Sequence, residues 1–332
     1  MIEQLLTYGW WVAAVFIVFG FVALVKGADW LVDGASAIAK RFGITDLVIG
    51  LTVVAFGTSM PEFVVNMVSV AEGSTDLALT NILGSNIINT FVILGLTAVV
   101  YPITSRKRSR DFDIPMSIIA GVLVLMFVAI QLPFGEESRG IGRAGGIILL
   151  VVFGYFLYNT FRHAQDHPQE NEENEVKSEP LPVRRALALM LGGIVGLCLG
   201  GELIVKSAVD LATRMGVSEA IIGLTIVALG TSLPELATSV IAAAKHHNSD
   251  IALGNVFGSN IFNVFFVLAT SAAIHPLPAY DGIELDAVMA TLGSIIVWMA
   301  VKTNKKRKIQ RWTGALLLLV YAVYLTYRLW TV

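Results

Sequence analysis

The chain has 332 residues, of which 55% are hydrophobic and only 14% are charged, and its mean hydropathy is +0.74. Soluble domains are about 25% charged, so the composition excludes an ordinary soluble protein and predicts an all-α polytopic membrane protein. The net charge of −2 and the lack of a basic-aromatic pattern give no reason to expect a nucleic-acid partner. The single cysteine, Cys198, excludes an internal disulfide and a thiolate metal site, and we interpret it as a small packing residue.

Ten segments are long and apolar enough to span a lipid bilayer, which needs about 20 residues. The apolar run at 10–25 has no basic segment before it, so we interpret it as a retained first span rather than a signal peptide. The predicted spans are 10–34, 47–71, 77–100, 114–132, 142–161, 186–209, 219–244, 251–274, 284–301 and 311–330.

One long hydrophilic stretch, residues 162–185, divides the chain into a first half at 1–161 and a second half at 186–332. Its Glu, Asn and Pro content predicts a solvated cytoplasmic linker. Its glutamates leave a calcium-sensing role open, although no loop with spaced ligands is present.

The placement of Lys and Arg predicts the orientation. Basic residues concentrate in the loops that follow the odd-numbered spans, as in 104–111 and 302–311. Cytoplasmic loops carry such an excess, so we expect a multi-pass protein of the cell (plasma) membrane with both termini extracellular.

The two halves contain an internal repeat. The sequence GLTVVAFGTSMPEF at 50–63 returns as GLTIVALGTSLPEL at 223–236, and DLALTNILGSNIIN at 76–89 returns as DIALGNVFGSNIFN at 250–263. The matched motifs therefore cover 50–89 and 223–263. Since each copy holds five spans, an odd number, the second must enter the membrane from the opposite face, which predicts two inverted five-helix repeats with a site between them.

The first motif places unusual chemistry in an apolar span. Pro61 cannot donate a backbone hydrogen bond, so it frees carbonyl oxygens, and Thr58, Ser59 and Glu62 lie beside them. The second copy repeats this arrangement with Thr231, Ser232, Pro234 and Glu235. Such an all-oxygen set favours hard cations such as Ca²⁺ and Na⁺.

The second motif adds further oxygen ligands. Ser85 and Asn89 are four residues apart on one helix face, and Ser259 and Asn263 match them. Helix packing alone would explain these small residues. It does not explain two glutamates in mid-membrane, which usually mark an ion path, although protonated structural glutamates are the alternative.

At these residues the chain resembles the Ca²⁺/cation antiporter superfamily, and within it the Na⁺/Ca²⁺ exchangers, especially the compact prokaryotic members. The resemblance implies that Glu62 and Glu235 are the central Ca²⁺ ligands and that Thr58 and Thr231 coordinate through backbone oxygens. It also implies Na⁺ sites formed by Ser59, Ser85, Ser232 and Ser259 with the carbonyls of Ala55 and Ala228. The first copy departs from the family pattern by reading TNILGSN where the family has GNILGSN. Asn263 stands where some members carry aspartate, so K⁺ co-transport is not expected.

The motifs thus predict an antiporter that exchanges Na⁺ for Ca²⁺ by alternating access and extrudes Ca²⁺. The alternative within transport is an H⁺/Ca²⁺ antiporter, because paired glutamates also bind protons. A cation channel is a third interpretation, and it would conduct without a counter-ion gradient. An intramembrane enzyme would need a base beside its serine, and none is available. We expect no catalytic residue, no cofactor and no obligate protein partner; the transported ions and the lipid bilayer are the predicted partners.

Overall fold

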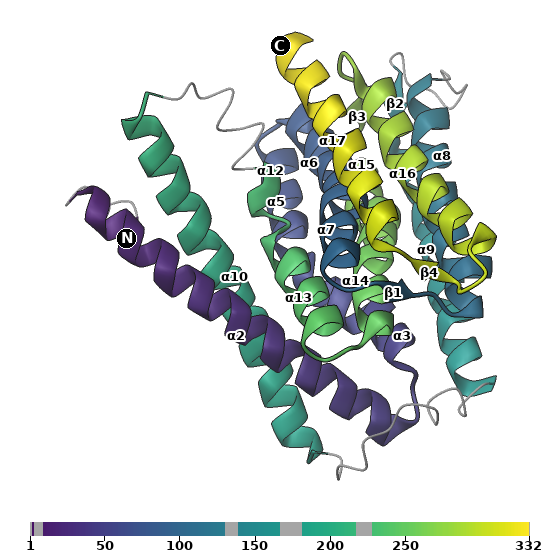
Figure 1. Ribbon diagram of the computed structural model, residues 1–332. Helices are drawn as coiled ribbons and strands as arrows, with labels where there is room; N and C mark the ends of the chain where they lie inside the picture. Colours follow the sequence, from purple (N-terminus) through teal and green to yellow (C-terminus); the bar gives the residue numbers. More distant parts are fainter. Residues whose placement is uncertain (1, 3–8, 130–138, 167–180, 217–227, 332) are drawn as a thin grey trace.

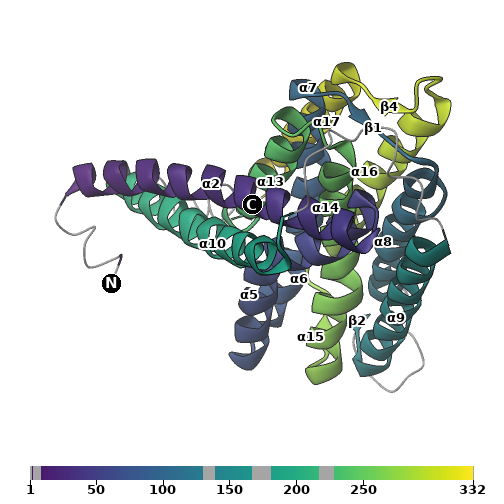
Figure 2. The ribbon, with the colours of Figure 1, turned by 90° about the horizontal axis from the view of Figure 1, so that it is seen from below.

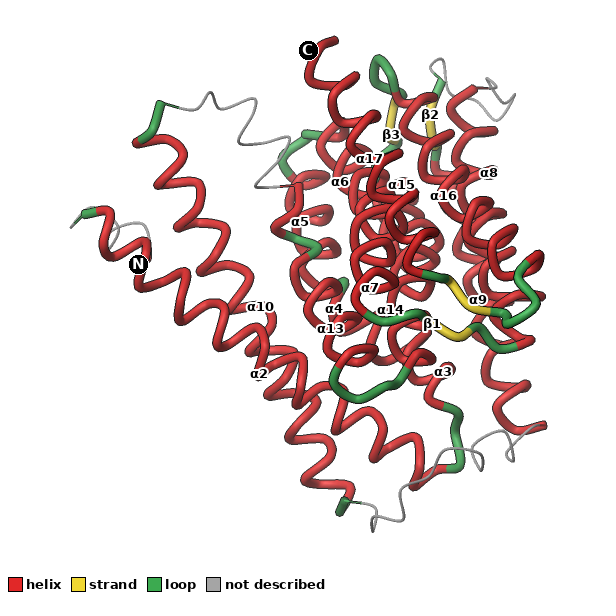
Figure 3. The backbone as a smooth tube through the Cα atoms, in the orientation of Figure 1, coloured by secondary structure: helices red, strands yellow, loops and turns green. Residues whose placement is uncertain are grey.

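Helices make up nearly the whole of the computed structural model, which describes residues 2, 9–129, 139–166, 181–216 and 228–331 (Figure 1). Within these ranges the strands form two short pairs between long helices, as Figure 3 shows. A chain that crosses lipid must satisfy its backbone polar groups internally, and a helix does this within one segment. The helical class expected from the composition is confirmed.

The helical segments follow the two predicted halves. The first half contains α2 (Trp10–Phe42), α3 (Asp46–Ile49), η1 (Gly50–Val54), α4 (Ala55–Thr58), α5 (Met60–Ala71), α6 (Thr75–Ile87), η2 (Ile88–Ile93), α7 (Leu94–Val100), η3 (Ser109–Asp113), α8 (Ile114–Ala129) and α9 (Arg143–Asp166). The second contains α10 (Val183–Arg214), α12 (Ala228–Gly230), α13 (Leu233–Ala244), α14 (Ser249–Phe262), η6 (Asn263–Leu268), α15 (Ala269–Ile274), α16 (Ile283–Thr303) and α17 (Arg311–Thr331). The η segments are π-helical turns inside longer helices.

Eight of the described helices are long and apolar enough to cross a membrane: Trp10–Phe42, Thr75–Val100, Ser109–Ala129, Arg143–Ala164, Val183–Arg214, Ser249–Ile274, Ile283–Thr303 and Arg311–Trp330. A ninth span is the bent pair Asp46–Thr58 and Met60–Ala71. The remaining predicted span, 219–244, is described from residue 228 onward as α12 and the apolar α13, and residues 219–227 lie outside the described part. Residues 130–132 of the predicted fourth span and 167–180 of the predicted linker also lie outside it.

The helices α2 and α10 form a crossed, tilted pair at one side of the molecule, and Figure 2 shows them side by side and extending away from the other helices. Glycines allow their backbones to meet. A Cβ atom built on Gly27 would lie 2.8 Å from the Gly193 carbonyl oxygen, and one on Gly193 would lie 2.7 Å from that of Gly27. Gly20 and Gly200 repeat this contact at 2.8 and 2.7 Å. Side chains at these positions would force the helices apart, so close packing makes α2 and α10 one unit.

The centre of the molecule is built on α6 and α14. Every residue of α14 from Ile251 to Phe262 is buried, although the segment contains three polar side chains, Asn255, Ser259 and Asn260. The outer helices instead expose apolar side chains such as Phe19, Leu191 and Leu319. A surface of this kind suits a lipid environment, and it places the polar residues of both motifs in the interior.

The two strand pairs join the halves crosswise. β1 (Ile103–Thr104) pairs antiparallel with β4 (Lys308–Ile309), and β2 (Gly140–Ile141) pairs antiparallel with β3 (Leu277–Pro278). Each pair therefore takes one strand from each half. In Figure 1 β2 and β3 lie near the upper end of the bundle and β1 and β4 lie well below them. Equivalent loops at opposite ends are the pattern expected of an inverted repeat.

Candidate cation-binding site

Both GTSxPE segments contain a break between two helices. In the first half α4 ends at Thr58 and α5 begins at Met60, with Ser59 between them at φ −86° and ψ 8°, and the two parts of the span are bent by 47°. In the second half Ser232 has φ −89° and ψ 6° and precedes α13. Each new helix has a proline in its first turn, where the missing N–H donor costs nothing. The predicted effect of proline on this span is confirmed.

Glu62 and Glu235 lie in the first turns of α5 and α13, and both side chains are fully buried. The N-terminus of a helix carries a partial positive charge, which stabilises an ionised carboxylate beside it. Burial of an ionised group without a counter-charge is otherwise strongly unfavourable. Two such carboxylates therefore form a site with a strong demand for a cation.

The serine at each break reaches the glutamate of the other half. Ser59 Oγ donates to Glu235 Oε1 at 2.8 Å, and Ser232 Oγ donates to Glu62 Oε1 at 3.5 Å. The second contact is at the long limit of a hydrogen bond. Because each carboxylate depends on a hydroxyl from the opposite repeat, the site belongs to both halves together.

The serines of the second motif complete this symmetry. Ser85 Oγ lies 3.5 Å from Glu62 Oε1, and Ser259 Oγ lies 3.4 Å from Glu235 Oε1. Both Oε1 atoms thus face two hydroxyl groups, whereas both Oε2 atoms are buried without a hydrogen-bond partner. A buried carboxylate oxygen that accepts no hydrogen bond is an available cation ligand.

Asn89 and Asn263 show the same pattern. Asn89 Nδ2 donates to Asn260 Oδ1 at 3.1 Å, and Asn263 Nδ2 donates to Asn86 Oδ1 at 3.2 Å. Both Oδ1 atoms are buried and accept no hydrogen bond. The sequence analysis did not single out Asn86 and Asn260. The signal was present in the repeated GSN, whose asparagine we read as packing but which orients the amides of the neighbouring repeat.

The two threonines are not equivalent. Thr58 Oγ1 donates to Asn255 Oδ1 at 3.0 Å, and Asn255 Nδ2 lies 3.3 Å from the Glu235 carbonyl oxygen and 3.0 Å from Ser239 Oγ. In contrast, Thr231 Oγ1 has no hydrogen-bond partner within the described residues. Asn255 is a further residue that sequence reasoning missed, and it ties a break in one half to the glutamate of the other.

The alanine carbonyls differ in what can be said of them. Ala55 is fully buried, and its carbonyl oxygen accepts from Ser59 N at 3.0 Å and from Thr58 Oγ1 at 3.3 Å. A cation bound at this oxygen would replace the Thr58 hydroxyl as its second partner. Ala228 is the first residue of α12, directly before the second break.

A second buried carboxylate occurs in each half, and both have basic partners. Asp286 accepts from Tyr280 at 2.6 Å and from Tyr324 at 2.7 Å and lies 3.4 Å from Arg328. Burial and the neighbouring Asp286 carboxylate raise the pKa of the Tyr280 hydroxyl well above its usual range. This hydroxyl therefore stays protonated and donates. Asp113 lies 3.5 Å from Arg108. These carboxylates hold helix ends in place and are not part of the oxygen set above.

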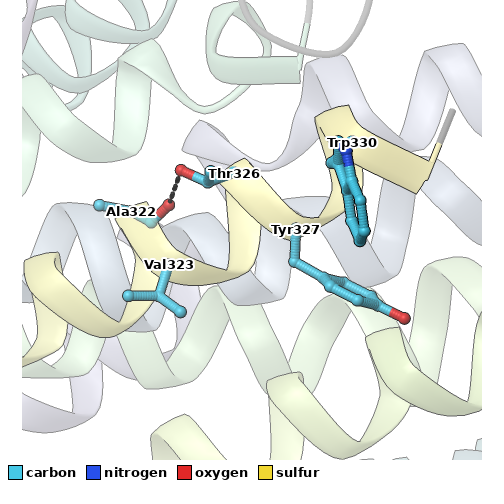
Figure 4. Close-up of a pocket in the computed structure, with 5 residues that line it drawn as sticks. All are labelled: Ala322, Val323, Thr326, Tyr327 and Trp330. Carbon is cyan, nitrogen blue, oxygen red and sulfur yellow. Dashed lines mark hydrogen bonds between the residues drawn. The ribbon is translucent and has the colours of Figure 1, made fainter.

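Figure 4 shows a separate hollow on α17, with a volume of about 420 Å³ and a lining of Ala322, Val323, Thr326, Tyr327 and Trp330. The only hydrogen bond drawn there joins Thr326 Oγ1 to the Ala322 carbonyl within the helix, at 2.8 Å. None of the predicted ligands lines this hollow. It is an apolar depression on an outer helix and offers no chemistry to an ion.

The oxygen set and its two-fold arrangement can be compared with known proteins. A family model described as sodium/calcium exchanger protein matches residues 12–162 and 185–330. The chain belongs to the sodium/calcium exchanger family. As a member of this transporter family it is a multi-pass membrane protein and not an enzyme.

Two relatives of this exchanger chain match it over nearly their whole length. It is 36% identical over 317 residues to the putative antiporter CaxA of Alkalimonas amylolytica, which covers 94% of the chain and 97% of the relative. It is 30% identical over 338 residues to the sodium/calcium exchanger MaX1 of Methanosarcina acetivorans, which covers 93% and 96%.

The fold is also that of a solved structure. The sodium-calcium exchanger NCX_Mj, in crystals soaked with Na⁺ and Ca²⁺, matches with a TM-score of 0.79 at 30% identity, over 95% of this chain and 98% of that one. The predicted all-helical membrane fold with two repeat halves is thereby confirmed.

Proposed function

We propose that this protein is a secondary active antiporter that exchanges Na⁺ for Ca²⁺ by alternating access. The observation that carries the proposal is the pair of fully buried carboxylates, Glu62 and Glu235, each facing a serine of the opposite repeat. Their Oε2 atoms accept no hydrogen bond. Relatives that carry the words antiporter or sodium/calcium exchanger in their names support the same reaction.

In this proposal Glu62 and Glu235 bind Ca²⁺ together with the backbone oxygens of Thr58 and Thr231. Na⁺ is bound by the hydroxyls that surround the carboxylates and by the carbonyls of the preceding residues; these ligands are Ser59, Ser85, Ser232, Ser259, Ala55 and Ala228. Asn89 and Asn263 contribute the amide oxygens that accept no hydrogen bond. Oxygen ligands in a flexible cage suit Ca²⁺, and neutral hydroxyl and amide oxygens suit Na⁺.

Charge explains why transport is an exchange. With both glutamates ionised, the empty site carries a charge of −2, and moving this charge between the two faces is unfavourable. One Ca²⁺, or at least two Na⁺, compensates the charge and permits the transition. The carrier therefore crosses loaded in both directions, which couples the two ion flows.

The direction follows from the stoichiometry. If three Na⁺ enter for each Ca²⁺ that leaves, one net charge crosses in each cycle, which is worth about 2.3 kcal/mol per 100 mV. A membrane potential negative inside then favours Ca²⁺ extrusion. The proposed setting is the cell membrane, with both termini outside as the distribution of Lys and Arg predicts.

The test is Ca²⁺ uptake by purified protein in proteoliposomes. An outward Na⁺ gradient should drive uptake, while an outward H⁺ or K⁺ gradient of the same size should not. Uptake driven by H⁺ alone would establish the H⁺/Ca²⁺ antiporter instead. Uptake that needs no counter-ion gradient would indicate a channel, and either result would reject the proposal.

A further inference from the structure

A cluster of opposite charges fastens α2 to the loop that follows α13. Lys245 Nζ lies 2.5 Å from Asp29 Oδ2, and His246 Nε2 lies 2.8 Å from Asp29 Oδ1. His246 Nδ1 lies 3.5 Å from Asp33 Oδ1 on the next turn of α2. We call these four residues the first latch, and they lie on the face that the charge pattern predicts to be cytoplasmic.

The same loop also holds the start of the second span. Asn248 Nδ2 donates to Asp46 Oδ2 at 2.6 Å, at the beginning of α3. α13 itself packs along α2 in this region. The contacts made by the 245–248 loop therefore close this face by joining α2, α3 and α13.

The repeat assigns a counterpart to each residue of the first latch. Positions 50 and 223 align, and the same offset pairs Asp29 with Glu202, Asp33 with Lys206 and Lys245 with Glu72. Two of these three positions have exchanged the sign of their charge: α10 carries the base at 206, and the loop after α5 carries the acid at 72. The complementarity between helix and loop is thus kept, with opposite polarity.

In this structure the counterpart residues are not joined across the gap between helix and loop. Lys206 Nζ lies 3.0 Å from Glu202 Oε1, one turn away on the same helix. Glu72 is exposed at the end of α5. One face of the molecule therefore has its charges paired between α2 and the loop, while on the other face the base pairs within α10.

The α2 and α10 pair connects the two faces mechanically. Because their backbones meet at Gly27 and Gly193 and again at Gly20 and Gly200, the two helices must move together. Bringing α10 toward the loop after α5 would carry α2 away from the loop after α13. The two contacts then exclude each other.

We propose that Glu72 and Lys206 form a second latch, which closes when the first latch opens and holds the protein in its opposite access state. This rests on the proposed exchange by alternating access. In an inverted repeat the two halves exchange conformations between the access states, so α10 takes toward the loop after α5 the position that α2 now has toward the loop after α13. Lys206 then meets Glu72 as Asp33 now meets His246.

The expected strength of each latch is small. Partly exposed ion pairs bias a two-state equilibrium by a factor of about five at most. This suits a carrier, because a strong bond in either state would slow the cycle. Reversing the charges at the second latch leaves the ligands of the cation site untouched.

Cross-linking reads the two states without any ion flux. In a Cys198→Ser background, the variant Glu72→Cys with Lys206→Cys is treated with a short thiol-to-thiol cross-linker, and Asp29→Cys with Lys245→Cys serves as the folded control. We expect the control pair to react in the resting protein. The 72–206 pair should react up to about fivefold more when Lys245→Ala is added to weaken the first latch.

Lys305→Ala is the matched comparison, because Lys305 is an exposed lysine on the same predicted face outside the latch. It should leave both cross-linking yields unchanged. If the control pair reacts and the 72–206 pair does not, with or without Lys245→Ala, the second latch is rejected. If both pairs react as expected while Na⁺ drives no Ca²⁺ uptake, the latch stands and the proposed ion coupling fails.

Discussion

The two helix breaks have the same GTSxPE sequence pattern but different surroundings. At the first break Ser59 donates to Glu235 at 2.8 Å and Thr58 bonds Asn255, whereas at the second Ser232 is 3.5 Å from Glu62 and Thr231 Oγ1 has no partner within the described residues. Two copies with one sequence pattern can differ in this way only if the molecule rests in one access state. The asymmetry is therefore conformational, and substitutions at equivalent positions should have unequal effects wherever it applies.

The glutamates are where the two halves should be most nearly equal. We expect Glu62→Gln and Glu235→Gln each to lower Na⁺-driven Ca²⁺ uptake about 30-fold or more, because each removes one charge from a fully buried pair. Uptake in proteoliposomes measures this effect. Near-normal transport by either variant would contradict a site shared by both carboxylates.

The glycines of the second motif should separate the halves more clearly. A Cβ on Gly258 would lie 2.7 Å from Ala55 Cβ and 2.8 Å from the Leu51 carbonyl oxygen, whereas no described atom lies within 4 Å of one on Gly84. We expect Gly258→Ala to destabilise this state by about 1–3 kcal/mol through overpacking. Gly84→Ala should cost less. Thermal unfolding in detergent compares the two variants, and equal losses would contradict the packing difference.

The break serines test the comparison directly at the carboxylates. A hydrogen bond to a charged group contributes about 1.5 kcal/mol or more, so Ser59→Ala should weaken Ca²⁺ binding about tenfold. Ser232→Ala removes the longer contact and should have the smaller effect in the same state. Calorimetric titration of the two variants with Ca²⁺ decides, and a larger loss for Ser232→Ala would reverse our assignment of the tighter side.

The smallest expected difference is between Asn255 and its counterpart Asn81. Asn255→Ala breaks the contacts to Thr58, Ser239 and the Glu235 carbonyl and should cost about 1–3 kcal/mol of stability. The Nδ2 group of Asn81 has no hydrogen-bond partner within the described residues, so Asn81→Ala should cost little. Denaturation of both variants under matched conditions checks this, and equal costs would mean that the asymmetry does not extend to this network.

The sequence alone predicted the ligand positions well, because proline, hydroxyl and carboxylate residues have no ordinary place in an apolar span. The helix break at Ser59 and the crosswise approach of Ser59 to Glu235 both follow from the repeat and its inversion. Binding of ions by these residues stays a prediction until it is measured.

Hydropathy predicted the spans but not their full lengths. α2 continues to Phe42 rather than ending near residue 34, because its last turn carries Lys40 and Arg41, which favour a helix C-terminus, and it closes on Gly43 in the left-handed region. A window that scores only apolar residues ends at the first charges. The polar ends of tilted helices are lost in this way.

The asparagine network was beyond sequence reasoning for a different reason. Asn86, Asn255 and Asn260 act through contacts with residues from about 170 to 200 positions away, and nothing local marks which amide faces which partner. The same holds for the state of the molecule. Two nearly identical motifs carry no record of which one is closed.

The crosswise strand pairs described above have a consequence for the integrity of the chain. Since β1 finds its partner only in β4, and β2 only in β3, each half completes its loops with strands of the other. A polypeptide cut between α9 and α10 would therefore yield two fragments that recognise each other rather than two independent proteins. Separately expressed fragments should co-purify, as the halves of an ancestral dimer once did before one chain contained both.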